Sequence, residues 1–373
     1  MKIGIVTYHR AHNHGAVLQA YALSTYLKKI GHIVGFVDYW PHYQSRGYDL
    51  IHLNILKTRN ITTLYKLKFI LKKIILFPFI FIRYYKYQQF IKNELKLSSR
   101  IKYRHSKNIL DEYDIYIYGS DQIWRSQNTT EFKGYDPVYY GDYPENTAKK
   151  KITYAASMGN VNLDRSKTEY IKNKLSNYSV ISAREIQLID ALTGLINNKI
   201  YHVIDPVFLL DTIEWSKLLK ERKKRRKYIL FYHLLLSDEA TKLAKKIASR
   251  YDYDIIEIRG KIQLKEALKL KIHNYGPIDF LNLIYHADYV ISTSFHGIAF
   301  SILFKKQFFA ISIKNSSDRI VSLLQKTSLT ERIIENHQDA NIEVSIDYHR
   351  INDKLNEFIN DSKKFIIKSL SES

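Results

Sequence analysis

The amino-acid sequence predicts an α/β protein with two domains, each built on an open parallel sheet. First, a chain of 373 residues is longer than one hydrophobic core usually supports, and its 45% of apolar residues is ample for two cores. Second, short β-branched runs alternate along the chain with helical patterns of apolar residues. Third, several of these runs end in polar residues, as strands of parallel sheets do where they build sites.

The first strand, helix and second strand are predicted within the first 38 residues. Residues 2–8 have the pattern of a buried strand, and a polar turn follows at residues 9–15. Gly31 ends the predicted helix, and residues 33–38 form the next strand. This is a β-α-β unit of the Rossmann type. Five apolar residues mark the buried face of its helix, at spacings of four and three: Ala16, Ala20, Leu23, Leu27 and Ile30.

Four further short apolar runs complete the first predicted sheet, and each is followed by polar residues. They are residues 115–118, before Gly-Ser-Asp; 152–156, before Ser-Met-Gly; 180–183, before Arg-Glu; and 202–204, before Asp-Pro. The carboxyl ends of parallel strands meet at one edge of the sheet, so these polar residues are expected to gather there. We assign residues 1–210 to this domain.

The second predicted domain covers residues 211–373 and begins near a charged linker at residues 221–227. Strands are predicted at 228–232, 254–258, 289–291 and 308–313, and helices at 237–250 and 277–285. Residues 352–370 form one amphipathic helix at the end of the chain.

The segment 289–303, YVISTSFHGIAFSIL, carries the clearest chemical signal in the chain. A strand pattern enters a turn of small residues, and Gly297 opens an apolar helical pattern. A strand that leads into a helix N-terminus offers free backbone amides and a favourable dipole to phosphate or carboxylate. His296 adds a group that can transfer protons at that point. The segment therefore indicates a site for an anionic substrate.

Composition excludes several classes of function. The chain has no cysteine, which rules out disulfides, thiolate catalysis and cysteine–zinc sites and is consistent with a cytoplasmic location. It starts directly with a strand pattern, so no signal peptide is expected. The net charge of +21 fits nucleic acid, an anionic membrane or an anionic substrate. No nucleic-acid-binding motif is recognisable, so we predict no nucleic-acid partner.

Basic charge is densest in an insert of the first domain at about residues 60–95. Lysines and arginine alternate there with isoleucine, leucine, phenylalanine and tyrosine over residues 66–92. The longest apolar stretch without charge, residues 74–82, is interrupted by Pro78 and is too short to span a membrane. Two interpretations remain: a pair of helices lying in the interface of an anionic membrane, or a buried helical insert with a solvated basic face.

Six segments, in this order, resemble the polysaccharide pyruvyltransferase family over residues 1–329: GIVTYHRAHNHGAVLQAYAL, YGSDQIW, ITYAASMG, ISARE, DPVFLL and GPIDFLNLIYHADYVISTSFHGIAFSILF. The resemblance implies a fold like that of the GT-B group transferases, with two Rossmann-like domains facing a cleft. It also implies transfer of a pyruvyl group, as a ketal, from phosphoenolpyruvate to two hydroxyls of a sugar in a surface, capsular or exopolysaccharide precursor. The reaction needs no metal or other cofactor.

The resemblance places the phosphoenolpyruvate donor against the second domain. His296 matches the histidine of the family's SFHG turn and is expected to contact the donor and act as an acid. Arg184 matches a strand-end arginine that can form paired hydrogen bonds to phosphate or carboxylate. The alternative for Arg184 is a structural salt bridge with Asp205 or Glu185. Asp205 matches an aspartate that either orients this arginine or accepts the acceptor's proton. The remaining donor-binding candidates are Ser294, Phe295, Gly297 and Arg319.

The first domain is expected to face the sugar acceptor. Trp124 could stack on a sugar ring, although tryptophan more often packs in a core. The acceptor-binding candidates are His9, Asn13, Gly15, Ser120, Asp121, Gln122 and Trp124. Three nearby histidines at positions 9, 12 and 14 could suggest a metal site, but no matching ligand spacing recurs, and we predict none. A lipid-linked acceptor at the inner face of the membrane would fit the basic insert.

Two other functions remain open from sequence. A GT-B glycosyltransferase using a nucleotide sugar would also place phosphates at a helix of the second domain. Against it, the second half lacks a paired-glutamate ribose signature. The other alternative is a basic membrane-surface module on an inert Rossmann scaffold, in which histidine, arginine and aspartate at strand ends would have no purpose.

Overall fold

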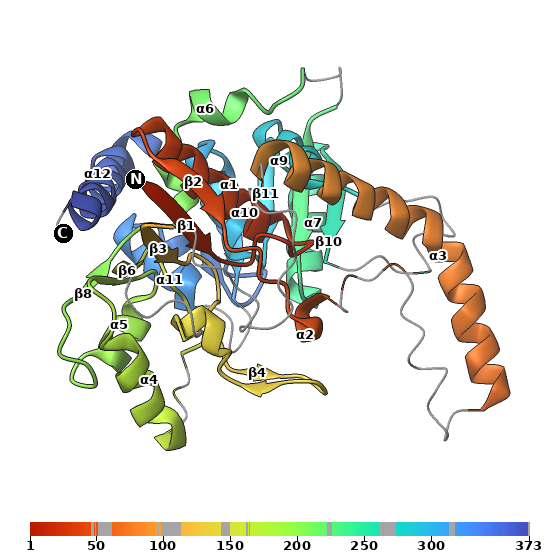
Figure 1. Ribbon diagram of the computed structural model, residues 1–373. Helices are drawn as coiled ribbons and strands as arrows, with labels where there is room; N and C mark the ends of the chain where they lie inside the picture. Colours follow the sequence, from red (N-terminus) through yellow and green to blue (C-terminus); the bar gives the residue numbers. More distant parts are fainter. Residues whose placement is uncertain are drawn as a thin grey trace.

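The structure is a computed structural model that describes residues 1–45, 48, 50, 62–95, 97, 113–142, 150–161, 163, 165–221, 226–260, 264, 274–312 and 318–371. Two parallel sheets with helices around them form the centre of the molecule (Figure 1). This confirms the predicted α/β fold class with two Rossmann-like halves. Most of the predicted linker, residues 222–225, and the start of the basic insert, residues 60–61, lie outside the described residues.

The first sheet has the strand order β2-β1-β3-β6, and all its neighbours are parallel. Single parallel bridges continue it from β6 to the parallel pair β7-β8. Its strands are β1 (Lys2–Val6), β2 (Ile33–Phe36), β3 (Ile115–Tyr118), β6 (Lys150–Thr153), β7 (Ile181–Ala183) and β8 (Ile200–His202). The same half contains the hairpin β4 (Gln127–Asn128) and β5 (Lys133–Gly134) and the helices α1 (His14–Lys29), α2 (His42–Ser45), α3 (Thr63–Phe90), α4 (Thr168–Leu175) and α5 (Ile186–Leu192).

The second sheet has the order β10-β9-β11-β12-β13 and is also parallel throughout. Its strands are β9 (Tyr228–His233), β10 (Asp254–Arg259), β11 (Tyr289–Ser292), β12 (Gln307–Ile311) and β13 (Ile333–Ile334). The helices of this half are α6 (Thr212–Ser216), α7 (Asp238–Tyr251), α9 (Pro277–Tyr285), α10 (Phe295–Leu303), α11 (Asp318–Lys326) and α12 (Tyr348–Ser371).

One predicted strand is displaced. We predicted a strand at residues 202–204, but β8 ends at His202. The backbone N–H of Ile204 donates to Ser362 Oγ of α12 at 2.9 Å instead of to a strand. A neighbouring helix therefore takes the hydrogen bond that would have extended the strand, which local sequence does not reveal.

The two halves share a hydrophobic core around α1. This helix contacts α9 and α10 of the second half, and its buried residues Leu18 and Leu23 belong to the same core as Phe280 and Ile298. The last helix, α12, packs back on the first sheet, where the Phe358 ring lies 4.9 Å from the His202 ring. The boundary between residues 210 and 211 stays a prediction.

The basic insert forms one long helix, α3, rather than the predicted pair of helices. Thr62 caps it, with Oγ1 accepting the N–H of Tyr65 at 3.4 Å, and Pro78 lies inside it. Proline removes one backbone hydrogen bond and usually kinks a helix, but here it does not divide α3. Figure 1 shows α3 leaving the two sheets and running outward.

The alternative of a buried insert is wrong for most of α3. Only Leu76, Tyr87 and Phe90 of its 28 residues are buried. Near its C-terminal end, α3 is held to the body by Lys86, whose Nζ lies 2.8 Å from Asp279 Oδ2, and by Tyr87, whose hydroxyl lies 2.8 Å from His14 Nδ1. Within the described ranges, no helix combines the length and the hydropathy needed to cross a bilayer.

Candidate active site

His296 stands at the start of α10, where β11 turns into the helix, as predicted from the SFHG segment. Its side chain is buried, with 5% of the residue exposed. Its Nε2 lies 3.6 Å from Asp205 Oδ2, beyond hydrogen-bond reach, and has no hydrogen-bond partner among the described residues. A Cβ on Gly15 would come within 1.9 Å of His296 Nδ1. Glycine at position 15 therefore allows the N-terminus of α1 to pack against this imidazole.

The turn before His296 is closely packed on the second sheet. The N–H of Ser294 donates to Ser292 Oγ at 3.0 Å, and a Cβ on Gly297 would lie 2.2 Å from the same oxygen. Phe295, His296 and Gly297 occupy the first turn of α10, whose backbone N–H groups have no acceptor within a helix. These amides and the helix dipole favour an anion here.

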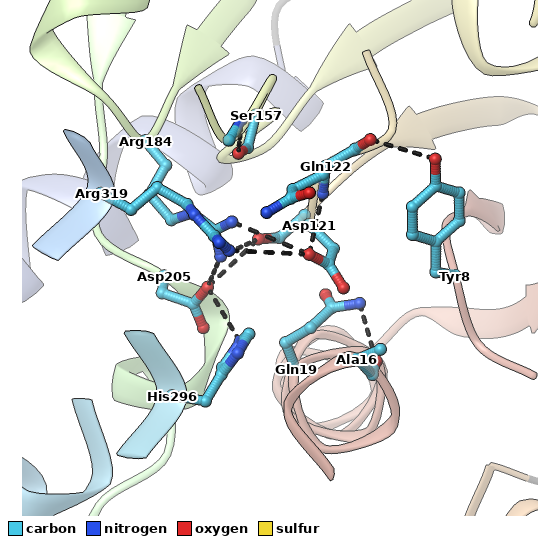
Figure 2. A network of polar contacts seen from close by, with 12 residues as sticks. Tyr8, Ala16, Gln19, Asp121, Gln122, Ser157, Arg184, Asp205, His296 and Arg319 are labelled. Carbon is cyan, nitrogen blue, oxygen red and sulfur yellow. Dashed lines mark hydrogen bonds and ion pairs between the residues drawn. The ribbon is translucent and has the colours of Figure 1, made fainter. Parts of the chain in front are cut away.

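Arg184 follows β7 directly and brings a guanidinium from the first sheet to the same place (Figure 2). Its Nη1 donates to Asp205 and, at 3.2 Å, to Ser120 Oγ. Its Nε and Nη2 are buried and have no hydrogen-bond partner in the described part of the chain. Burial alone would lower the pKa of Arg184, but Asp205, Glu185 and Asp121 outweigh it and raise the pKa. The guanidinium is therefore cationic and holds unused donors.

Arg319, the second residue of α11, supplies another buried guanidinium. The ring of Phe295 lies near both cations, with its centre 4.5 Å from the Arg184 guanidinium carbon and 5.6 Å from that of Arg319. Burial, and then repulsion from Arg184, lower the pKa of Arg319 to about 10, so it also stays charged at neutral pH. Its Nε has no partner among the described side chains and backbone groups. A small pocket is lined by Arg184, Arg319, Phe295 and Asp205, among other residues.

Asp205 begins the turn that leads into Pro206 and is fully enclosed. Its Oδ1 accepts the N–H of Val207 at 3.0 Å, and its Oδ2 accepts Ser120 Oγ–H at 3.2 Å and binds Arg184. Burial would raise the pKa of this carboxyl, but Arg184 and the nearby His296 hold it well below its usual range. A carboxylate so strongly ionised is a poor proton acceptor, so this geometry favours orienting Arg184 over taking the acceptor's proton.

Asp121 is the more accessible carboxylate of the site. Its Oδ1 lies 3.9 Å from Arg184 Nη2 and 4.0 Å from Arg319 Nη1, and it accepts the N–H of Gln122 at 2.8 Å. Its side chain is 13% exposed, whereas that of Asp205 is 0% exposed. Asp121 therefore faces both cations without a direct hydrogen bond to either of them.

Two of the acceptor-binding predictions are wrong. Trp124 is fully buried and donates its indole N–H to the carbonyl of Tyr139 at 3.1 Å, so it cannot stack on a sugar. His9 is also buried, with Nε2 3.0 Å from Asp38 Oδ1 and Nδ1 3.0 Å from the carbonyl of Thr7. Both residues are structural because tertiary packing leaves neither of them a surface for a ligand.

The remaining acceptor-side residues lie around the N-terminus of α1 and the end of β3. Asn13 caps α1, its Oδ1 accepting the N–H of Ala16 at 3.3 Å, and Gly15 faces His296. Ser120 is buried, and its hydroxyl accepts a hydrogen bond from Arg184 and donates one to Asp205. The carbonyl of Gln122 accepts the hydroxyl of Tyr8 at 3.0 Å. An acceptor-binding role for Asn13, Asp121 and Gln122 stays a prediction.

Sequence reasoning missed Gln19 as a residue of the site and considered Glu185 only as a salt-bridge partner of Arg184. Gln19 of α1 donates Nε2–H to Thr7 Oγ1 and to the carbonyl of Ala16, both at 2.9 Å, and Figure 2 shows its side chain beside that of Asp121. Glu185, next to Arg184, binds Ser157 Oγ, and burial raises the pKa of its carboxyl. Gln19 falls beside Ala16 and Ala20 on the predicted core face of the helix, and a polar residue there is a usable signal.

Together these features define a two-domain α/β protein with a buried, cationic site between its two sheets. A family model for polysaccharide pyruvyl transferases matches residues 13–315. The chain belongs to this family, which makes it a transferase. A comparison with curated proteins finds no match.

Several solved structures are similar over most of their length. The UDP-N-acetylglucosamine 2-epimerase from Rickettsia bellii is 11% identical with a TM-score of 0.48, over 100% of this chain and 96% of that one. The Methanocaldococcus jannaschii UDP-GlcNAc 2-epimerase is 14% identical with a TM-score of 0.44, over 100% of both chains. The E. coli heptosyltransferase WaaC with ADP is 9% identical with a TM-score of 0.39, over 86% of this chain and 90% of that one.

Proposed function

We propose that this transferase moves a pyruvyl group, as a ketal, from phosphoenolpyruvate to a sugar of a surface, capsular or exopolysaccharide precursor. One observation carries the proposal. N–H donors of two guanidiniums and the Nε2 of His296, none with a hydrogen-bond partner among the described residues, converge on one buried place between the sheets. Phosphoenolpyruvate has two anionic groups, a carboxylate and a phosphate, and guanidinium forks match both.

The reaction can be written with the residues of this site. His296 protonates the methylene carbon of phosphoenolpyruvate, and positive charge develops at C2. A sugar hydroxyl oxygen attacks C2, and the C2–O bond to phosphate breaks, so that phosphate leaves with that electron pair and with the proton of the attacking hydroxyl. A second hydroxyl closes the ketal ring, and its proton goes to a base. Asp121 is proposed as that base because it is less enclosed than Asp205 and lies near both guanidiniums. No step calls for a resident cofactor.

We also propose that the acceptor is lipid-linked and that the protein meets it at the cytoplasmic face of a membrane. The exposed, basic helix α3 supports this part of the proposal, since cations attract anionic headgroups. The acceptor would then lie on the side of the site formed by the N-terminus of α1.

To test the proposed transfer, the purified protein is incubated with phosphoenolpyruvate and with galactose- or mannose-type acceptors, both soluble and lipid-linked. Release of inorganic phosphate and a new ketal methyl signal in the NMR spectrum are expected together. The matched control is Asp38→Asn, which alters a buried charge cluster whose ion-pair partners are His9 and Arg10. Transfer of sugar from a nucleotide donor, with no phosphate released from phosphoenolpyruvate, would instead identify a glycosyltransferase.

A further inference from the structure

We propose that α3 and the loop Leu234–Leu236 form one docking face for an anionic bilayer, beside the acceptor side of the site. The inference rests on the membrane contact in the proposed function and names the surface that makes it. It does not depend on the identity of the donor.

The helix α3 presents an apolar surface that the described residues leave open. Large apolar side chains are exposed along most of its length. They are Leu64 (62%), Tyr65 (53%), Leu67 (62%), Ile70 (37%), Leu71 (57%), Ile74 (64%), Phe77 (42%), Phe81 (45%), Ile82 (40%) and Tyr85 (54%). Isolated exposed apolar residues are ordinary, but a run of this length on one helix indicates a surface for contact.

The charge of α3 favours an anionic bilayer over a second copy of this chain as the partner of its apolar surface. The helix has six basic residues and no acidic residue: Lys66, Lys68, Lys72, Lys73, Arg83 and Lys86. A second copy of this chain, docked through the same surface, would bring like charges together. An anionic bilayer instead accepts the apolar side chains below its headgroups and pairs the lysines with lipid phosphates.

A loop from the second domain continues this surface. Leu234, Leu235 and Leu236 follow β9 directly and are 42%, 53% and 72% exposed. Arg83 of α3 donates to the carbonyl of Gly260 at 2.9 Å, and a Cβ on Gly260 would lie 3.5 Å from Leu234. The loop therefore lies beside α3, so both domains would contribute to the same face.

The face is connected to the site through the turn before α1. Arg83 Nη2 donates to the carbonyl of His12 at 3.4 Å, and Tyr87 contacts His14. The next residue, Gly15, packs against His296. A bilayer on this face would thus hold a lipid-linked sugar near the end of α1 that borders the site.

The test measures sedimentation with vesicles of phosphatidylcholine, alone or mixed with phosphatidylglycerol, without phosphoenolpyruvate or acceptor. One variant changes Lys66, Lys68, Lys72 and Lys73 to glutamine, and another changes Leu234, Leu235 and Leu236 to serine. The control changes Lys364→Gln, Ile367→Ser and Lys368→Gln on α12, where Ile367 is 49% exposed. Figure 1 shows α12 at the opposite end of the molecule from α3.

We expect the unmodified protein and the α12 control to bind only the anionic vesicles, and less at high salt. Each lysine near an anionic surface contributes about fivefold to binding, so the four-lysine variant should bind at least about a hundredfold more weakly. The leucine variant should also bind more weakly. Equal binding by the lysine variant would overturn the proposal. The proposal would also be overturned if the unmodified protein did not bind the vesicles and instead formed a dimer that the four-lysine variant dissociates. If either result were found and the protein still converted a soluble acceptor, the docking face would be wrong but the proposed pyruvyl transfer would be unaffected.

Discussion

Two clusters of buried charge in this protein look alike in composition but differ in how completely they are paired. In the first, Asp38 holds both His9 and Arg10, and each ring nitrogen of His9 has a partner. In the second, Asp205 holds Arg184, yet buried nitrogens of Arg184, His296 and Arg319 have no hydrogen-bond partner among the described residues. An unsatisfied buried polar group costs about 1–3 kcal/mol. The difference therefore separates a fully paired cluster from one whose unused donors we propose bind an anionic ligand.

We expect the largest difference between the clusters, in kcat and in the free energy of unfolding, when one central side chain of each is replaced. His296→Ala should lower kcat by about a thousandfold or more, since it removes the proposed acid. Its free energy of unfolding should fall less than that of Asp38→Asn, because Nε2 makes no hydrogen bond to the described residues. Asp38→Asn should do the reverse, lowering stability while kcat stays near normal. Steady-state kinetics and urea unfolding of both variants check this, and near-normal kcat in His296→Ala would remove His296 from the mechanism.

Exchanging arginine for lysine should distinguish the clusters by their unused donors. Arg184→Lys keeps a positive charge but loses the fork of N–H donors, so kcat/KM for phosphoenolpyruvate should fall by about a hundredfold. Arg10→Lys should leave kcat/KM within about twofold of the unmodified protein, because Arg10 Nε and Nη2 both donate to Asp38 and are not available to a ligand. Equal losses in both variants would mean that the two clusters do not differ in function.

A smaller effect is expected from crowding His296 without changing its chemistry. In Gly15→Ala the new Cβ would fall 1.9 Å from His296 Nδ1, so the imidazole or α1 must shift. We expect kcat to fall by about ten- to a hundredfold, as misplacement by about 1 Å costs on that order. Gly260→Ala is the matched control, since its Cβ would meet no atom closer than 3.5 Å. Unchanged kcat in Gly15→Ala would show that the site tolerates movement of His296.

The smallest effect concerns stability alone. Burial would raise the pKa of Asp38, but Arg10 and His9 lower it to about 2. A carboxyl with a lowered pKa stabilises the folded state above its unfolded value of about 4 and loses that contribution as pH falls toward 2. The shift is equivalent to about 2 kcal/mol. The stability difference between the unmodified protein and Asp38→Asn, measured by urea unfolding, should therefore shrink by that amount from pH 5 to pH 2. A constant difference would contradict the pairing.

Sequence reasoning succeeded where position depends on topology. The helix Pro277–Tyr285 was predicted with its observed bounds, and His296 and Arg184 were both placed at strand ends that the fold brings together. It failed where tertiary packing determines whether a side chain is buried. No local pattern shows whether a tryptophan such as Trp124 lies in the core or stacks on a sugar. The hydrogen-bond partners of a side chain cannot be read from residue types, which is why His9 was assigned to a ligand. Gln19 was overlooked although a polar residue on the predicted core face of the helix was a signal.

The most direct test of the central claim is calorimetric titration of phosphoenolpyruvate into three proteins: unmodified, Arg184→Lys and Asp38→Asn. If the unpartnered donors form the anion site, the unmodified protein and Asp38→Asn should bind with the same affinity. Arg184→Lys should bind at least about tenfold more weakly, because it loses charge-assisted hydrogen bonds to the ligand. Equal affinity in all three proteins, or no binding of phosphoenolpyruvate beside clear binding of a nucleotide sugar, would contradict the claim.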